Sequence, residues 1–366
     1  MSPDPVSPEP TSPEAQAPVD RTSFDVPVVD VSGWSSGDPA ARIGVIRAVD
    51  DALRRVGFMQ VVGHGVAPNV IQGMLDACDR FFALPADAKA ETLPPSADVN
   101  RGWAPLGTES LLYSLGADAP PDLFEAFNIG RDVVDEADPA VAVERHRFLA
   151  PNSWPEALPE MRGPVVAYFD EVAGLASRLC EIFAVALGVE QDFFARRCQH
   201  PTETLRMIRY ERAPGSPDPL PEQMRMGAHT DYGIVTVLYG DQVPGLEVLG
   251  PDGAWHGVVP VDGAYLVNLG DLLAEWTNDR WRSTLHRVVP PPASADGPSL
   301  RRSAAFFLDG DYDALVECLP TCCDDENPPH YPPVLAGEHL LAKLMGPRTL
   351  QASDVEVDTV GERSFG

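Results

Sequence analysis

Two histidines and one aspartate have the residue types and spacing of a metal site. His229 and Asp231 are separated by one threonine, and His286 follows 55 residues after Asp231. Alternate side chains of an extended segment point to one face, so His229 and Asp231 are expected to point the same way. Two imidazoles and a carboxylate on one side of a metal leave its other positions open, as O2-activating Fe(II) sites require; zinc accepts the same donors. The spacing predicts a site for iron or zinc.

A guanidinium and a hydroxyl occur two residues apart in the next apolar run. Arg301, Arg302 and Ser303 begin the run RRSAAFFL, 15 residues after His286. Strand alternation places Arg301 and Ser303 on one face and Arg302 on the other. A guanidinium beside a hydroxyl can hold the far carboxylate of a dicarboxylic acid. Tyr210 lies in the strand-like run before His229 and Asp231, where it is a candidate for a further hydrogen bond to that carboxylate.

The second half of the chain has the texture of a β-rich core. Short β-prone runs recur at intervals of roughly 8 to 15 residues, and Pro251-Asp252-Gly253 separates two of them as a hairpin turn. This spacing favours a β-sandwich or jelly roll over a sheet with helical crossovers. We predict that a helical layer packs on this core as one compact unit. The predicted strands are 205–212, 234–240, 245–250, 254–260, 264–270, 283–289 and 301–308.

The first half reads mainly as helices. Apolar residues at helical spacing predict helices over about 40–56, 68–82 and 159–187, with short strand-like runs at 24–31 and 57–66. Residues 92–135 show no clean period. The predicted organisation is a disordered Pro-rich tail over 1–22, an N-terminal helical region over 23–200, a jelly-roll core over 201–350 and a C-terminal tail over 351–366.

Charge and composition exclude several functions. The formal net charge is −28, which opposes binding to nucleic acid and to anionic membrane surfaces. No run of about 20 apolar residues is present, and the N-terminus lacks the features of a secretory signal, so a cytoplasmic protein is expected. Cys318, Cys322 and Cys323 lack a CxxC pair and are interpreted as structural or surface thiols. The expected partner is a small molecule, and no protein partner is implied.

Six segments resemble the isopenicillin N synthase-like family of Fe(II)/2-oxoglutarate dioxygenases. The resemblance runs from about residue 24 to 345 and is most specific over 205–308. In one respect the chain differs: Ile208 and Glu211-Arg212 replace the asparagine and prolines that often surround the family's tyrosine. The matching segments are VPVVDVSGW (26–34), VGFMQVVGHGV (56–66), LRMIRYERAPG (205–215), MGAHTDYGIVTVL (226–238), NLGDLLAEWTNDRWRSTLHRVVP (268–290) and RRSAAFFL (301–308).

The resemblance implies a mainly β (α+β) fold, a double-stranded β-helix or jelly-roll core flanked by helices. It implies that His229, Asp231 and His286 bind Fe(II). Arg301 and Ser303, assisted by Tyr210, would hold the distal carboxylate of 2-oxoglutarate. The enzyme would consume O2 and release succinate and CO2 while hydroxylating, desaturating or cyclising a small organic substrate.

Two further residues are candidates for substrate contacts. Arg101 lies in the aperiodic stretch that a family-like architecture places near the pocket mouth, where it is expected to pair with a substrate carboxylate. Phe307 is expected to line the pocket. Two alternatives stay open: an Fe(II) oxidase of the same fold without 2-oxoglutarate, in which Arg301 binds a substrate carboxylate, and, more distantly, a non-catalytic metal-binding jelly-roll protein.

Overall fold

The helices of the N-terminal half form where the apolar spacing predicts them. The computed structural model describes residues 24–96, 99–112, 120–132, 148–211, 219–220, 222–291 and 300–348, so the two predicted tails lie outside the described residues. Asp38 caps the first helix by accepting a hydrogen bond from the Ala40 amide at 2.9 Å, and Pro39 occupies its first turn. The helices are α1 (Pro39–Arg55), α2 (Pro68–Phe82), α3 (Ala86–Ala90), α4 (Arg162–Ala186), α5 (Asp271–Trp276) and α6 (Ala336–Arg348), with 3-10 turns at Ser32–Ser35, Pro159–Met161 and Ala195–Arg197.

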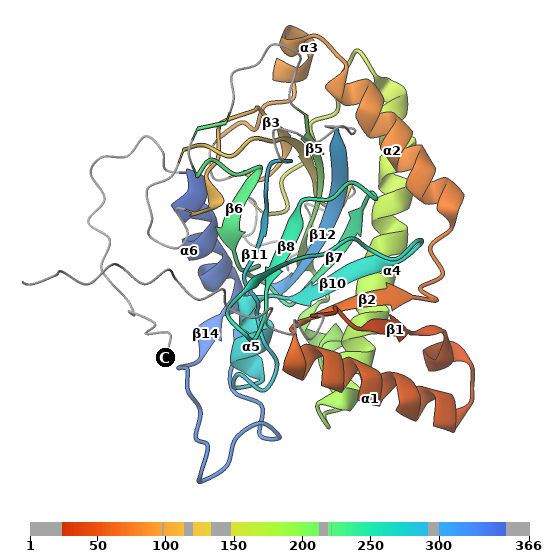
Figure 1. The fold of residues 1–366 in the computed structure, drawn as a ribbon, viewed down its shortest axis with the longest axis vertical. Helices are drawn as coiled ribbons and strands as arrows, with labels where there is room; N and C mark the ends of the chain where they lie inside the picture. Colours follow the sequence, from red (N-terminus) through yellow and green to blue (C-terminus); the bar gives the residue numbers. More distant parts are fainter. Residues whose placement is uncertain are drawn as a thin grey trace, which may run out of the picture.

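An eight-stranded sheet forms the larger layer of the core (Figure 1). Its order is β1-β2-β10-β7-β12-β5-β4-β3, with the two strands nearest the chain start paired in parallel at one edge. The long α4 helix and α2 cover its outer face. The strands are β1 (Val28–Asp30), β2 (Phe58–Val62), β3 (Gly102–Ala104), β4 (Glu125–Ile129), β5 (Pro201–Tyr210), β7 (Val235–Gly240), β10 (Tyr265–Leu269) and β12 (Arg301–Asp311).

A four-stranded sheet faces the inner side of the larger one. Its order is β6-β11-β8-β9, and the predicted hairpin turn joins β8 to β9, with Gly253 at a positive φ of 74°. A two-stranded ribbon of β13 and β14 lies apart from it. The strands are β6 (Met226–His229), β8 (Leu246–Leu249), β9 (Trp255–Gly257), β11 (His286–Val288), β13 (Leu315–Val316) and β14 (Val334–Leu335).

Alternation along β12 divides the core into two parts. Ala304, Phe306 and Leu308 pack on the helical side, where the Phe306 ring meets Phe169 of α4 at 5.2 Å between centroids. The residues between them face the space between the two sheets, where an apolar cluster that includes Tyr210 and Val288 is buried. One strand therefore serves both the helical layer and the interior of the jelly roll.

The N-terminal half supplies more strand than the sequence predicted. β1 and β2 extend one edge of the large sheet, while β3 and β4 form its other edge. These last two strands lie in the stretch that showed no period, because they are short and Gly102 begins β3 at a positive φ of 76°. The whole is a helix-flanked double-stranded β-helix, as predicted.

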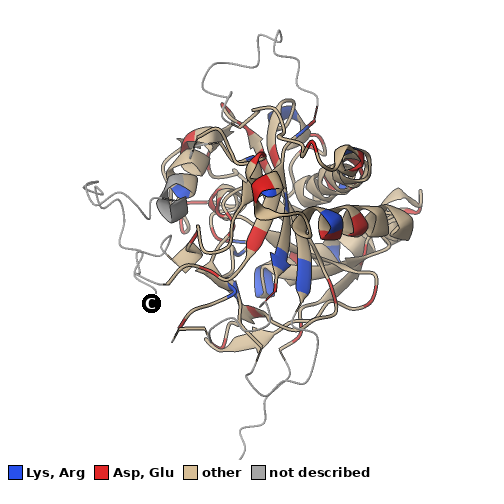
Figure 2. Ribbon diagram, turned by 90° about the horizontal axis from the view of Figure 1, so that it is seen from above, with Lys and Arg blue, Asp and Glu red and all other residues tan. Residues whose placement is uncertain are grey.

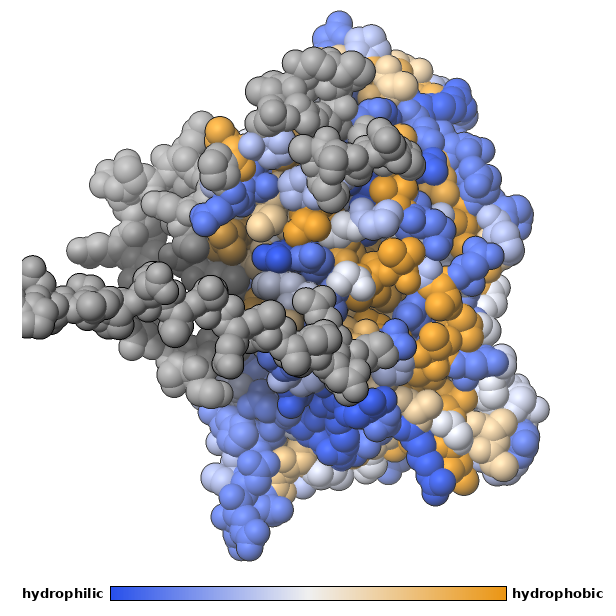
Figure 3. Space-filling model, viewed as in Figure 1, coloured by the Kyte–Doolittle hydropathy of each residue, from blue (hydrophilic) through white to orange (hydrophobic). Residues whose placement is uncertain are grey.

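The surface is strongly polar. Asp and Glu residues are spread over the ribbon, with Lys and Arg residues among them (Figure 2). On the face seen in Figure 3, hydrophilic residues surround smaller apolar areas. Within the described ranges, no helix is both long and apolar enough to cross a bilayer.

Candidate active site

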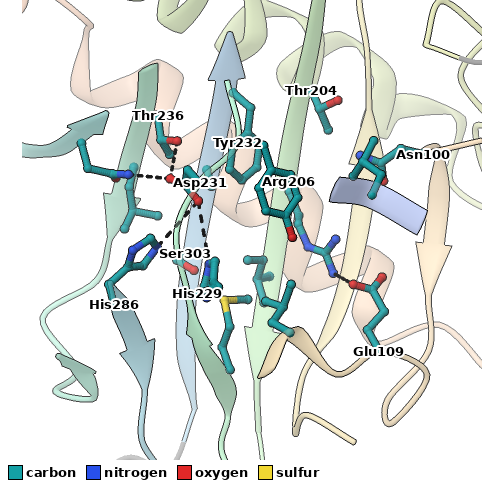
Figure 4. Close-up of a pocket in the computed structure, with 18 of the residues that line it drawn as sticks. Asn100, Glu109, Thr204, Arg206, His229, Asp231, Tyr232, Thr236, His286 and Ser303 are labelled. Carbon is teal, nitrogen blue, oxygen red and sulfur yellow. Dashed lines mark hydrogen bonds and ion pairs between the residues drawn. The ribbon is translucent and has the colours of Figure 1, made fainter. Parts of the chain in front are cut away.

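Three side chains from different segments converge at one end of the space between the sheets (Figure 4). His229 ends β6 and His286 begins β11, and the antiparallel register places the two directly opposite each other. Asp231 lies just beyond β6, held by an isolated bridge to Gly270. Its Oδ1 atom is 3.8 Å from Nε2 of His229 and 3.7 Å from Nε2 of His286. The predicted ligands are thus brought together, although the strand ends before Asp231.

The histidine rings are oriented so that Nε2 faces the centre. Nδ1 of His229 donates to the Gly227 carbonyl at 2.8 Å, and Nδ1 of His286 donates to the Thr284 carbonyl at 3.1 Å. Burial, and then the neighbouring His286, lowers the pKa of His229 to about 4. His229 is therefore neutral at pH 7 and offers its Nε2 lone pair to a metal without first losing a proton.

Asp231 is the anionic member of the group. Its Oδ2 atom accepts hydrogen bonds from the Thr236 hydroxyl and, at 2.6 Å, from the Asn268 amide, so Oδ1 is the oxygen that faces the imidazoles. Burial opposes ionisation, but the two histidines and these two donors outweigh it and lower the pKa of Asp231. A buried carboxylate between two imidazoles fits a divalent metal, and this donor set is the one that leaves open positions on Fe(II). Among the described residues, no other group of His, Cys, Asp and Glu has this arrangement.

Thr236 and Asn268 are functional residues that the sequence did not reveal. They lie opposite each other in the register of β7 and β10. Replacing Thr236 with valine keeps the β-branched shape and removes the hydroxyl that orients Asp231. We expect Fe(II) to bind about 10- to 100-fold more weakly, the usual effect of losing such a supporting contact. Equilibrium titration with Fe(II) under argon measures this.

Thr204→Val is the matched control for that change. Thr204 lines the same cavity from β5, and no hydrogen bond among the described residues joins it to the three ligands. Its Fe(II) affinity should equal that of the unmodified protein. Equal affinities for both valine variants would contradict the orienting role of Thr236.

The three residues predicted to bind a carboxylate lie in the same cavity as the metal ligands. Arg301 and Ser303 on β12 face inward, and Tyr210 is directly opposite Arg301 in the register of β5. Arg302 points to the outer side, where it pairs with Asp79 of α2 at 2.7 Å. Burial raises the pKa of Tyr210, against the opposing effects of Arg301 and Ser303, so its phenol stays protonated and able to donate. The alternation predicted from the sequence is therefore found.

Arg101 and Phe307 also line the cavity. The Arg101 guanidinium is buried, and it donates to the backbone carbonyls of Ala150, Asn100 and Phe148. Burial lowers the pKa of this arginine to about 10. Its bonds tie the loop to the segment that precedes α4. The structure thus gives Arg101 a bracing contact that the sequence did not suggest.

A row of polar residues continues beyond Arg301, Ser303 and Tyr210 on the same two strands. Thr202, Thr204 and Arg206 of β5 face the cavity, as does Asp309 of β12. Strand alternation is the signal that reveals them: Arg206 is four residues before Tyr210, and Asp309 is eight after Arg301. Glu109 pairs with Arg206 from a loop, where no period indicates its direction.

Asp309 is a buried carboxyl whose pKa no cation of the described residues lowers. It is 7% exposed, and burial, followed by the charges of Asp231 and Glu203, raises its pKa to about 8. An unfolded aspartate has a pKa of about 3.9. Between this pKa and the higher pKa of the folded state, the Asp309 carboxyl is protonated in the folded chain and ionised in the unfolded chain. The folded chain therefore loses stability as the pH rises through this range.

Asp309→Asn is expected to remove that pH dependence in the metal-free protein. The stability of the variant relative to the unmodified chain should grow by on the order of 3 kcal/mol between pH 4 and pH 8. Denaturant unfolding of both proteins at the two pH values measures this. A difference that does not change with pH would contradict the raised pKa.

The three late cysteines lie close together in the chain as free thiols. Sγ of Cys318 and Sγ of Cys323 both lie against the Leu319 carbonyl, and Cys322 is buried. Their interpretation as structural or surface thiols stays a prediction.

Comparison with known proteins gives the same assignment for most of the chain. Residues 26–157 match the model described as non-haem dioxygenase in morphine synthesis N-terminal, and residues 202–310 match that of the 2OG-Fe(II) oxygenase superfamily. The chain is 34% identical to the 2-oxoglutarate-Fe(II) type oxidoreductase hxnY of Emericella nidulans, over 84% of this chain and 86% of that one. It is 36% identical to validamycin A dioxygenase of Streptomyces hygroscopicus, over 87% and 85%.

Solved structures extend the likeness to the fold and the cosubstrate. A full-length Neurospora crassa protein, crystallised in complex with alpha-KG and thymine, superimposes with a TM-score of 0.75 at 27% identity, covering 89% of this chain and 98% of that one. A putative 2OG-Fe(II) oxygenase family protein from Caulobacter crescentus gives a TM-score of 0.75 at 29% identity, with coverage of 88% and 99%. With His229, Asp231 and His286 as its iron ligands, this chain is a 2-oxoglutarate- and Fe(II)-dependent dioxygenase and belongs to the 2OG-Fe(II) oxygenase superfamily.

Proposed function

We propose that the enzyme binds the distal carboxylate of 2-oxoglutarate with Arg301, Ser303 and Tyr210 and oxidises a small organic substrate in the outer part of the same cavity. Succinate and CO2 leave as products of the cosubstrate. Hydroxylation is the default outcome, and desaturation or cyclisation differs only in the later fate of the substrate. Arg301, Ser303 and Tyr210, together called the carboxylate clamp, carry this proposal.

The state of Arg301 is the main support. Its guanidinium is 2% exposed, and its Nε and Nη1 atoms have no hydrogen-bond partner within the described structure. A buried cation with unused donors is costly unless an anion pairs with it. The carbon of the guanidinium lies 5.0 Å from the centre of the Tyr210 ring, and Arg301 lines the cavity. A carboxylate supplies both the charge and the acceptors that these donors lack.

Arg225, which immediately precedes β6, is a second cation near Arg301. Burial, and then the charge of Arg301, lowers the pKa of Arg225. The neighbouring positive charge adds to the attraction that the Arg301 side of the cavity exerts on an anion.

The chain has separate tasks around the reaction. When bound, the iron activates O2 and supplies the oxidising power. Thr236 and Asn268 hold Asp231 in its orientation, and apolar side chains such as Leu238, Leu246 and Val288 keep water from the cosubstrate's end of the cavity.

The substrate is inferred to lie beyond the ligands, in the outer part of the cavity. Phe307 and Tyr232 contribute aromatic surface there, and Leu340 of α6 lines it from the opposite side. Of the similar proteins above, one is named validamycin A dioxygenase and another was crystallised with thymine. A small polar organic molecule is therefore the substrate class proposed here. The pairing of Arg101 with a substrate carboxylate stays a prediction. In the structure, its guanidinium donates to backbone carbonyls.

Product analysis tests this function directly. The Fe(II)-loaded protein, supplied with 2-oxoglutarate and O2, is expected to form succinate slowly alone and faster with an accepted substrate. Succinate is measured by mass spectrometry, beside an anaerobic control and an Asp231→Ala control. Consumption of O2 with a substrate but without succinate would favour the oxidase alternative.

A further inference from the structure

One ionised pair lies on the cavity wall next to the proposed cosubstrate site. On β5, Arg206 follows Ile208 and Tyr210 inward along the same face, and its partner across the register is Ala305, two residues after Ser303. Arg206 is therefore the next cavity-facing position beyond the clamp. Arg206 and the three iron ligands line the same cavity.

The Arg206 guanidinium is bound by Glu109 through one nitrogen atom, while another nitrogen atom has no acceptor in the described structure. Glu109 accepts a hydrogen bond from its Nη2 at 2.8 Å, and its central carbon lies 4.9 Å from the centre of the Phe124 ring. Its Nε atom is buried without an acceptor in the described structure, and the side chain is 11% exposed. Figure 4 shows Arg206 in the cavity with Glu109 at its tip and Tyr232 on its other side. An arginine carries five N–H donors, so donors remain for a ligand.

Arg206 differs in this respect from the other guanidinium of the outer cavity. Arg101 donates to three backbone carbonyls, so its position is fixed by the loop that it braces. Arg206 donates to the ionised carboxylate of Glu109, and its Nε atom is left for another acceptor. Arg206 makes fewer bonds within the described structure and therefore has more donors left for a bound molecule.

Charge balance indicates the chemistry of that molecule. Glu109 neutralises Arg206, so the pair presents hydrogen-bond donors without net positive charge. A carboxylate placed there would lie near the Glu109 carboxylate, and Arg101, the other arginine that lines this part of the cavity, already donates to three backbone carbonyls. A neutral oxygen acceptor accepts from the guanidinium without that repulsion.

We propose that Arg206, neutralised by Glu109, orients the substrate by donating to an uncharged oxygen acceptor such as an amide, imide or lactam carbonyl, and that this site selects neutral substrates over carboxylic acids. The inference rests on the proposed function, because it places the substrate beyond 2-oxoglutarate in the same cavity. It adds a substrate-orienting residue and a charge preference to that function.

The test uses matched neutral and acidic probes with the intact Fe(II)·2-oxoglutarate complex under argon. The probe pairs are benzamide with benzoate and uracil with orotate. Binding is followed by the shift that each probe causes in the visible absorption band of the complex and by the melting temperature. We expect the neutral member of at least one pair to bind at least about 10-fold more tightly than its acid, the scale of one hydrogen bond to a charged group.

Variants separate orientation from folding. Arg206→Met should weaken the neutral probe at least about 10-fold. Arg209→Met, on the same strand but facing away and paired with Glu211, should not change it. Glu109→Gln leaves Arg206 with a net charge and should shift the preference toward the acid, which a purely structural role does not produce. If single variants unfold, the double variant Arg206→Met/Glu109→Met replaces the whole pair and should bind both members of each pair equally.

The outcomes decide the inference separately from the function. A visible band that never forms with Fe(II) and 2-oxoglutarate counts against the proposed function. A normal band with no neutral probe bound, with acids bound as tightly as neutral probes, or with an unchanged Arg206→Met variant overturns the assignment of Arg206. If Arg209→Met weakens binding of the neutral probe as much as Arg206→Met does, the assignment of Arg206 is likewise overturned.

Discussion

Asp231→Ala is expected to abolish both Fe(II) binding and turnover, with 2-oxoglutarate consumption falling at least about 1,000-fold. Asp231 supplies the only carboxylate among the three ligands, and its Oδ1 atom faces both Nε2 atoms. A carboxylate ligand contributes several kcal/mol to metal binding and each 1.4 kcal/mol is about tenfold, which sets that lower limit. Bound iron per chain and succinate formation are the two measurements.

Asp309→Asn is the matched control for this loss. It removes a second buried carboxyl from the same cavity, and the carboxyl of Asp309 is not part of the ligand group. The asparagine variant should keep one iron per chain. Full iron binding in Asp231→Ala, or equal losses in both variants, would contradict the assignment of the ligands.

Arg301→Leu carries the second large expected effect, a loss of 2-oxoglutarate affinity of roughly 30- to 4,000-fold. Removing one partner of a buried, hydrogen-bonded charge pair costs about 2–5 kcal/mol, which converts to that range. Iron binding should be unchanged, because Arg301 is not among the metal ligands. The apparent affinity is measured from 2-oxoglutarate titrations of the iron-loaded proteins.

Two controls isolate the carboxylate contact. Arg302→Gln alters the adjacent arginine, which faces the other side and pairs with Asp79, and it should leave the affinity within about threefold, as is usual for a surface ion pair. The cosubstrate analogue 2-oxovalerate has a methyl group in place of the distal carboxylate. The unmodified enzyme should prefer 2-oxoglutarate strongly, while Arg301→Leu should lose that preference. A preference retained by the variant would show that other residues bind the carboxylate.

The sequence predicted the parts of the fold and site that follow a period. The three main helices agree with their apolar spacing to within three residues. Each of the seven predicted strands overlaps an observed strand, whereas β6, β13 and β14 were not predicted. Alternation also gives the inward direction of Arg301 and Ser303 and the outward direction of Arg302. Each of these depends only on neighbours in the chain, so a single sequence contains the information.

Other parts depend on contacts between distant segments. Asn268 and Thr236 meet at Asp231 only because β10 pairs with β7 in one particular register. Glu109 reaches Arg206 from a loop without periodicity, and β3 and β4 are too short to show a pattern.

The departure at Ile208 has a structural meaning that the sequence did not reveal. Ile208 faces the cavity directly opposite Ser303, so an apolar side chain lies where the family often has an asparagine. In the proposed clamp, Ser303, Arg301 and Tyr210 would then make the polar contacts to 2-oxoglutarate on this part of the wall.

An anaerobic optical titration tests the central claim most directly. Metal-free protein is titrated with Fe(II) and then with 2-oxoglutarate, and the visible spectrum is recorded after each addition. If the iron ligands and the carboxylate clamp act together in one cavity, a weak charge-transfer band appears only when both are present, and it requires far more 2-oxoglutarate in Arg301→Leu. Iron that binds without any such band, or a band with the same 2-oxoglutarate dependence in the variant, would contradict this account.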